Sequence, residues 1–297
     1  MFKNLQIYRL PAPYLMIADQ LAILLEPQRF APASTNELLR QGWESPRDNG
    51  GLVHSAGGQF LLKLATEKKV LPGKAVKQRA AEMADKLEED QGFRPGKKAM
   101  KELIERAADE MLPKAFAVRS HVDVWIDPVN GWLVVNTPSP ARADDVIKLL
   151  LKAVDRMPLE SLRVQRSPAA MMTVWLDSDE APYNFTIDQD ATLRATGESK
   201  AQVSYKKHTL EPGDVGAHIA AGKQCVRLAM TWNSRISFVL TEQLGIKSIK
   251  ALDVLRESEV IARDADERFD SDFALMTGEL AKMLADLVEA LGGEAKA

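Results

Sequence analysis

The chain has 297 residues, of which 45% are apolar and 27% charged, and its formal net charge at pH 7 is -3. These values are typical of a soluble globular protein of roughly two or three lobes, and they argue mildly against a nucleic-acid binder, which more often has a basic balance. The single cysteine, Cys225, excludes a disulfide framework within the chain and fits a reducing compartment.

The N-terminal segment carries charged and amide side chains where a signal peptide needs an unbroken apolar core. The next apolar stretch, 14–25, is interrupted by Asp19 and Gln20 and is too short to cross a bilayer. We therefore expect a cytoplasmic protein without a membrane segment.

The first third of the chain mixes short strands, one helix and a glycine-rich connection. Apolar residues at every second position predict strands, and spacings of three and four predict helices. On that basis we expect a strand over 2–10, a helix over 14–25, a loop over 43–58 and a strand over 59–65.

Two helices joined by a short break are predicted next, over 74–91 and 97–112, with the break at 92–96. This helical hairpin carries many lysines, including Lys97, Lys98 and Lys101, but its acidic residues nearly match them. Composition alone therefore favours a solvated surface here.

The middle of the chain is predicted to hold a second, β-type hairpin. Residues 121–127 and 132–136 flank a turn in which Asn130-Gly131 supplies the positive φ angles that tight turns need. Further elements are expected as a helix over 142–154, short strands between 162 and 205, and a helical turn over 217–221.

The stretch from Lys200 to Ala251 is locally basic, with eight Lys and Arg against three Asp and Glu. Val226, Leu228, Met230 and Trp232 alternate with Cys225, Arg227, Ala229 and Thr231, and a similar alternation follows over 236–241. For the apolar sets to share a face, Trp232 must pair with Ile236, which leaves 233–235 as the turn. The opposite face then carries Arg227, Thr231, Ser237 and Thr241, a polar and cationic surface that suits an anionic polymer.

The C-terminal part is acidic instead, with twelve Asp and Glu against five Lys and Arg from Leu252 onward. Asp264 and Glu267 resemble a capping box, and apolar residues then recur at steps of three and four as far as Leu291, before Gly292-Gly293. A long helix is predicted, whose apolar stripe serves core packing or subunit pairing.

Motifs for known catalytic sites are missing from the sequence. Gly222-Lys223 does not form a phosphate loop, because Ala217 and Gln224 stand where glycine and a hydroxyl are required. The four histidines, His54, His121, His208 and His218, are dispersed without zinc-ligand spacing, and there is no Gly-x-Ser-x-Gly elbow. We expect no metal and no cofactor.

One enzymatic interpretation stays open. Glu198 and Lys200, preceded by Asp188 or Asp190 on predicted strands, have the carboxylate and lysine spacing with which metal-dependent nucleases bind a divalent ion. Such a triplet also arises by chance in a charged chain, so the nuclease is a weaker hypothesis than the two binding functions described below.

Several blocks of sequence together resemble the bacterial RdgC family of recombination-associated proteins. They occur in order over essentially the whole chain: residues 2–5 with 8–10, 113–116 with 125–127 and Gly131, 218–223 with Leu228 and Trp232, 235–239, 268–273 with 275–280, and 291–294. An ordered series of this length is specific in a way that one short motif is not, although none of the blocks is catalytic.

The resemblance implies a non-enzymatic DNA-binding protein whose two subunits form a closed ring around duplex DNA. Members of the family bind DNA, including single strands, with little regard to sequence, and they restrain the RecA recombinase by occupying its substrate. It implies an α+β fold of mixed antiparallel sheets with a helical tip and a long C-terminal helix. The lobes are expected as a central lobe (1–72 and 115–157), a tip lobe (73–114) and a base lobe (158–297).

The resemblance also implies roles for particular residues. The gate aromatic between subunits corresponds to Phe116, and its partner segment to Lys207-His208, where the family pattern has glutamine at the position of His208. Lys223 matches a lysine of the DNA-facing surface. The full set expected to bind DNA is Lys223, Arg227, Lys206, Lys207, His208, Lys97, Lys98 and Lys101.

An alternative from another class stays open beside the ring. The acidic C-terminal helix could mimic DNA and bind a basic partner directly, which would make the chain a protein-interaction scaffold. The ring hypothesis predicts a cytoplasmic, nucleoid-associated homodimer whose cations line the inside while carboxylates populate the outside.

Overall fold

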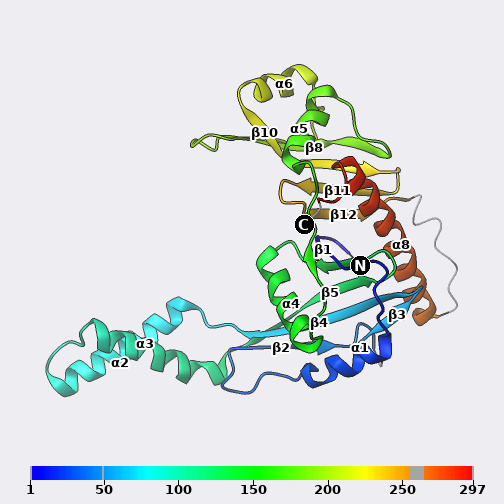
Figure 1. Cartoon of the computed structure of the whole chain (residues 1–297). Helices are drawn as coiled ribbons and strands as arrows, with labels where there is room; N and C mark the ends of the chain where they lie inside the picture. Colours follow the sequence, from blue (N-terminus) through cyan, green and yellow to red (C-terminus); the bar gives the residue numbers. More distant parts are fainter. Residues whose placement is uncertain (1, 49, 254–263, 296–297) are drawn as a thin grey trace.

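The fold is seen in a computed structural model, which describes residues 2–48, 50–253 and 264–295. Figure 1 shows a body built on one long twisted sheet, with a pair of helices projecting away from it. Arg256, Glu257, Glu259 and Arg263, which are among the charged residues counted from Leu252 onward, lie outside the described residues. No helix in the described ranges has the length and apolar character needed to cross a bilayer.

All twelve strands of the described residues belong to one antiparallel sheet, ordered β2-β4-β5-β6-β1-β12-β11-β10-β8-β9, with β3 on β4 and β7 on β1. The α+β fold with antiparallel strands is confirmed, but the separate sheets that were predicted are parts of a single sheet. The strands are β1 (Leu5–Arg9), β2 (Leu39–Glu44), β3 (His54–Ala56), β4 (Gln59–Lys69), β5 (Ala117–Asp127), β6 (Trp132–Asn136), β7 (Glu160–Ser161), β8 (Phe185–Ala195), β9 (Gln202–Tyr205), β10 (Lys223–Trp232), β11 (Ile236–Thr241) and β12 (Ile246–Ala251).

Helices cover the sheet and form the projection. They are α1 (Ala18–Leu25), α2 (Gly73–Gln91), α3 (Lys97–Met111), α4 (Pro140–Ala153), α5 (Pro168–Ser178), α6 (Pro212–Ala220) and α8 (Ala265–Ala290), with short 3-10 turns at Glu26–Gln28 and Leu112–Lys114. We call β2, β4, β5, β6 and β1 the central half of the sheet, and β12, β11, β10, β8 and β9 the base half.

The two faces of the sheet are covered differently. On one face of the central half, side chains such as Leu62 and Val124 pack with buried residues of α1 and α4. Neighbouring positions point the other way, so that Leu61 and Trp125 join a second core with α8, α5 and the base half. Within the described residues the base half is therefore packed on one face only.

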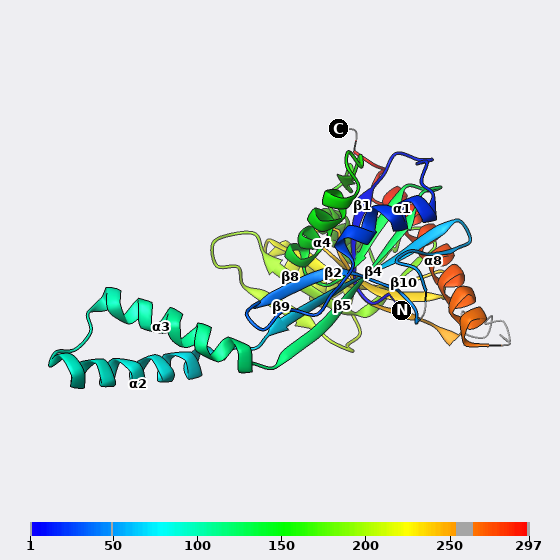
Figure 2. The same ribbon diagram turned by 90° about the horizontal axis from the view of Figure 1, so that it is seen from below.

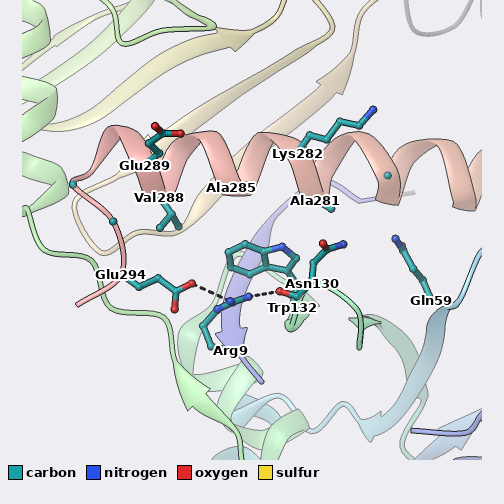
Figure 3. A pocket seen from close by; sticks show the side chains of 13 residues that line it. Arg9, Gln59, Asn130, Trp132, Ala281, Lys282, Ala285, Val288, Glu289 and Glu294 are labelled. Carbon is teal, nitrogen blue, oxygen red and sulfur yellow. Dashed lines mark hydrogen bonds and ion pairs between the residues drawn. The ribbon is translucent and has the colours of Figure 1, made fainter. Parts of the chain in front are cut away.

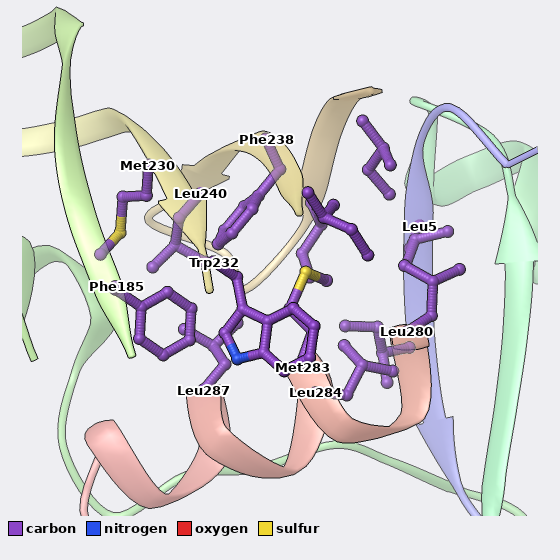
Figure 4. Packing of buried hydrophobic residues seen from close by; sticks show 14 of the residues in the cluster. Leu5, Phe185, Met230, Trp232, Phe238, Leu240, Leu280, Met283, Leu284 and Leu287 are labelled. Carbon is purple, nitrogen blue, oxygen red and sulfur yellow. The ribbon is translucent and has the colours of Figure 1, made fainter. Parts of the chain in front are cut away.

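Helix α8 supplies the centre of that second core, as predicted from its apolar stripe. Leu280, Met283, Leu284 and Leu287 are buried against strands of the base half, where Trp232 is buried with them (Figure 4). The indole Nε1 of Trp232 donates to the Asp286 carboxylate at 2.7 Å, so its polar atom is satisfied while the ring stays in the core.

The start of α8 is fixed to the far end of the central half. Asp264 caps the helix by accepting from the Glu267 amide at 2.8 Å, as the predicted capping box requires. One turn later, the buried His54 of β3 lies edge-on to Phe269, 5.0 Å between ring centroids, with its Nε2 3.3 Å from Asp270. Burial lowers the pKa of His54, and the Asp270 carboxylate opposes this shift in part.

The predicted helical hairpin is confirmed as α2 and α3, and it extends well away from the sheet in both views (Figures 1 and 2). Its own core is small: Val76, Ala80 and Ala107 form a buried cluster with partly buried methionines and leucines, and Ala84 is the other buried residue of α2. Gly92 ends α2 in the left-handed conformation, at a φ of 78°, which glycine adopts without strain.

Several predicted elements need correction. The region 162–205 was predicted as strands, but Pro168 begins helix α5, in which Met172, Trp175 and Leu176 form a buried helical stripe. The β-prone residues Thr173, Val174 and Trp175 lie inside this helix, where packing against β10 overrides their preference. The predicted turn at 217–221 is part of the longer α6, the expected loop at 43–58 contains β3, and strands β2 and β12 were not predicted.

A core variant tests the role of α8. Leu280→Ala should lower the free energy of unfolding by about 3 kcal/mol, because it removes a fully buried side chain and leaves a cavity. Chemical denaturation measures this. The matched variant Leu24→Ala, on a side chain that is 46% exposed, should cost about 0.5 kcal/mol or less; equal losses would contradict the assigned packing.

The His54 contact predicts a pH dependence. Since the pKa of His54 is lowered in the folded chain, the unfolded chain binds a proton near pH 6.5 that the folded chain does not. The free energy of unfolding should therefore fall as the pH drops below about 6.5, until the folded pKa is passed. Urea midpoints at pH values across this range should decline less in His54→Phe than in the wild type.

Candidate nucleic-acid interface

The basic hairpin predicted from the sequence is formed by β10 and β11. Trp232 pairs with Ile236, and residues 233–235 make the turn, in which Asn233 and Ser234 have positive φ angles. Arg227 is opposite Thr241, and Thr231 is opposite Ser237, so this predicted polar set shares one face. We call this uncovered side of the base half the open face; its side chains belong to neither large core.

Strand β12 adds two cations to the open face that the sequence did not place there. It pairs with β11 so that Lys250 is opposite Ser237 and Lys247 is opposite Val239. Both lysines lie in the locally basic stretch, but the register shift in β12 and the positive φ of Ser248 hide a simple alternation. Without a recognised strand, their shared face could not be assigned.

Two open hollows flank Arg227 on this face. One, of about 740 Å³, is lined by Lys207, Lys250 and Asp188 among others. The other, of about 250 Å³, is lined by Arg194, Lys247 and the start of α4. Arg194 is neutralised by Glu242 at 2.5 Å, which leaves Arg227, Lys207, Lys247 and Lys250 without an ion pair in the described residues.

The predicted segment Lys206-Lys207-His208 lies at the edge of the open face, after β9. The Lys207 amide donates to the Asp190 carboxylate at 2.7 Å, and Lys207 has a left-handed backbone with a φ of 51°. All three side chains are exposed. The hydrogen bond to β8 therefore fixes where this basic segment leaves the sheet.

Lys223 and Arg227 do not share a surface. A bulge between Cys225 and Arg227 shifts the alternation of β10, so Cys225 is buried against α5, where its amide donates to Thr173 at 2.9 Å. Cys225 was predicted on the polar side but lies in the core, whereas Val226, predicted in the apolar set, is buried outside that core, beside Arg227. Lys223 points toward α6, with its Nζ 3.4 Å from Nδ1 of His218.

The tip lysines lie far from the open face on the projecting hairpin. Lys97, Lys98 and Lys101 occupy the first turns of α3, and all three are exposed. Lys101 has a weak ion pair with Glu105 at 3.8 Å, whereas Lys97 and Lys98 have none in the described part of the chain. The first turn of α3 contains no acidic side chain, so its amides add positive potential beside them.

Phe116 lies where the tip joins the sheet, and it is 87% exposed. The Val70 amide donates to the Phe116 carbonyl at 2.8 Å, and the Lys69 amide donates to the Leu38 carbonyl at 2.9 Å, which brings three segments together. We call the exposed apolar residues on one side of this junction the apolar patch: Leu39, Val70, Phe116 and Val118. A contiguous group of exposed apolar residues is typical of a surface that binds another protein.

The carboxylates along α8 are largely engaged within the chain. Asp270 contacts Arg47 at 3.3 Å, Asp286 accepts from Trp232, and Glu279 contacts both Arg235 and Lys282 at 2.9 Å. These two cations help hold the pKa of Glu279 below its usual value against the opposing effect of burial. The carboxylates of Asp270, Glu279 and Asp286 are therefore already paired within the chain.

Another hollow, of about 870 Å³, lies beside α8 and is lined by small residues of that helix and by Trp132 (Figure 3). Arg9 lies over the Trp132 ring at 4.0 Å, contacts Glu294 at 2.9 Å and donates to the Asn130 carbonyl at 2.7 Å. Arg9 of β1 thus contacts both the β5–β6 hairpin and the segment that follows α8, and it holds that segment to the sheet.

The residues of the nuclease hypothesis are spread over one hairpin. Asp188 and Asp190 lie on β8, while Glu198 and Lys200 belong to the connection that leads to β9. The described residues contain no group of three or more His, Cys, Asp or Glu side chains that could hold a metal ion.

Comparison with known proteins gives a consistent result. The family model described as "Putative exonuclease, RdgC" matches residues 1–294. A protein from Herminiimonas arsenicoxydans named "Recombination-associated protein RdgC" is 58% identical over 294 residues, covering 99% of this chain and 98% of that protein. Proteins of the same name from Janthinobacterium sp. (strain Marseille) and Bordetella pertussis are 59% and 54% identical, with the same coverage.

Proposed function

The chain belongs to the RdgC family over nearly its whole length, and from this premise we propose that it is a sequence-independent DNA-binding protein that forms a closed homodimeric ring around duplex DNA. In this role it associates with the nucleoid, takes part in recombination and limits RecA by occupying the DNA that RecA uses. It also accepts single strands. The chemistry required is phosphate binding, and no catalytic step is needed.

The open face is the observation that carries this proposal. Arg227 extends from β10, Lys247 and Lys250 extend from β12 on the other side of β11, and Lys207 adjoins them at the edge. Cations on a rigid, uncovered sheet can neutralise phosphates without reading bases, and the release of counterions then supplies most of the affinity. Ring closure adds topological retention, so each contact can be weak.

The apolar patch supports a subunit contact at Phe116. An aromatic side chain this exposed, with exposed aliphatic residues on the same side of the neighbouring strands, buries its surface only when another molecule covers it. We infer that the patch meets the Lys207-His208 segment of a second copy. In this proposal Lys206 and the tip lysines Lys97, Lys98 and Lys101 are further DNA contacts, whereas Lys223 lies on the opposite side of β10 from Arg227 and is not part of the open face.

The scaffold alternative has less support. A helix that mimics DNA needs a row of unpaired carboxylates, and those of α8 at Asp270, Glu279 and Asp286 already have partners. The word exonuclease in the family description keeps a nuclease in view, with Asp188 or Asp190, Glu198 and Lys200 as its residues. A magnesium-dependent cleavage assay on plasmid DNA separates that activity from binding alone.

A charge variant tests the open face. Arg227→Ala should weaken binding to random-sequence duplex and reduce the slope of log affinity against log salt by about two, one for each copy in a dimer. Fluorescence anisotropy over a salt series measures both. Arg163→Ala, an exposed cation beside the end of α8, is the matched control and should leave the slope unchanged; equal effects would contradict the assignment.

A second variant tests ring closure. Phe116→Ser should weaken the dimer about 30-fold, because it removes an aromatic anchor worth about 2 kcal/mol at an interface centre. Analytical ultracentrifugation measures this, with Tyr183→Ser, equally exposed at 90%, as control.

A closed ring also predicts retention on circular DNA. The wild type should stay bound to covalently closed circles at high salt but dissociate from short linear duplex, and Phe116→Ser should lose this difference. Equal release of the wild type from both would count against a closed ring.

A further inference from the structure

Strand β8 is interrupted by a bulge in the middle of the open face. Ile187 pairs with Met230 and Ala191 pairs with Leu228, so four steps along β8 match two along β10. The extra residues belong to the segment Asp188-Gln189-Asp190, and a bulge of this kind re-aims side chains and is common next to functional sites. Here it directs two carboxylates into the larger hollow beside Arg227.

The two carboxylates of the bulge differ in their partners. Asp190 accepts from the Lys207 amide at 2.7 Å and so positions the basic segment. Asp188 accepts only from the Thr231 hydroxyl, at 2.9 and 3.2 Å from its two oxygens, and it has no ion pair in the described residues. Asp188 is half-buried, whereas Asp190 is exposed.

Charged groups from several neighbouring segments face this hollow. They are Asp190 on β8 itself, Arg227 on β10, Lys250 on β12 and Lys207 after β9, while β11 contributes the uncharged Ser237 and Val239. Three cations and two carboxylates thus share the place where phosphates would lie. Both carboxylates repel a phosphate here, but Asp190 is engaged by the Lys207 amide, whereas Asp188 accepts only from the Thr231 hydroxyl and has neither a cation nor an amide as partner in the described residues.

We propose that Asp188 limits the affinity of the open face for DNA, so that neutralising this carboxylate tightens binding. The inference rests on the proposed DNA binding by this face and names the residue that regulates it. A charged Asp188 repels phosphates and competes with them for Arg227, Lys207 and Lys250. A ring retained by topology then holds DNA loosely and can move along it.

The surroundings of Asp188 also make this effect sensitive to protons. Burial raises the pKa of Asp188, the Thr231 hydrogen bond opposes the shift, and the Asp190 charge reinforces it. Acidification therefore neutralises Asp188 at a higher pH than an ordinary aspartate. The expected consequence is DNA affinity that rises on acidification more steeply in the wild type than in a chain without this carboxylate.

Three variants test the proposal, each measured by anisotropy on random-sequence duplex at about 100 mM salt. Asp188→Asn keeps the size of the side chain and an oxygen for Thr231. It should bind about threefold to tenfold more tightly at neutral pH, the effect of removing one nearby like charge. Asp177→Asn, an exposed carboxylate of α5 on the covered side of the base half, should bind like the wild type. Arg227→Glu should bind more weakly.

The outcomes separate the inference from the proposed function. If Asp188→Asn matches the wild type while Arg227→Glu weakens binding, the open face binds DNA and the role of Asp188 is wrong. If Arg227→Glu also matches the wild type, the open face is not the DNA site, and both proposals fall. Thr231→Val supplies an independent measurement: it removes the bond that favours the charged carboxylate, so the rise of affinity on acidification should begin at higher pH.

Discussion

The burial of α8 against one face of the base half is the constraint on which the architecture depends. Its stripe of Leu280, Met283, Leu284 and Leu287 is buried with Trp232, and a large share of the apolar surface of the base half lies on that side. Since one face of a sheet suffices to form the core, the other is free to be polar. The cations of β10 and β12 are available to a ligand because the packing energy of these strands is gained on the opposite side.

Much of this arrangement follows from the sequence. The alternation in β10 and β11 predicted their register, and the steps of three and four in α8 predicted both the helix and its burial, because side-chain periodicity directly reflects which face is covered. The helical hairpin of the tip was equally clear. Its turn, from Gly92 to Gly96, has the strongest local signals in that region.

What could not be predicted depends on irregular backbone and long-range pairing. The bulge after Cys225 exchanges the faces of the residues before it, so Lys223 and Arg227 are separated although they are four positions apart. Helix α5 has a composition compatible with either type of element, and packing against β10 decides. The second bulge, which presents Asp188, left no recognised pattern in the sequence.

The seam between the two halves of the sheet is narrow. Strands β1 and β12 share a single pair in register, Leu5 with Ile246, supplemented by the Ile249 amide donating to the Lys3 carbonyl at 3.0 Å. Helix α8 crosses this seam, contacting β3 at its first turns and Trp232 near its end. Because α8 contacts both halves, this helix determines the angle between them more than the strand pairing does. The curvature of the surface that the sheet presents to a cylindrical polymer therefore depends on α8.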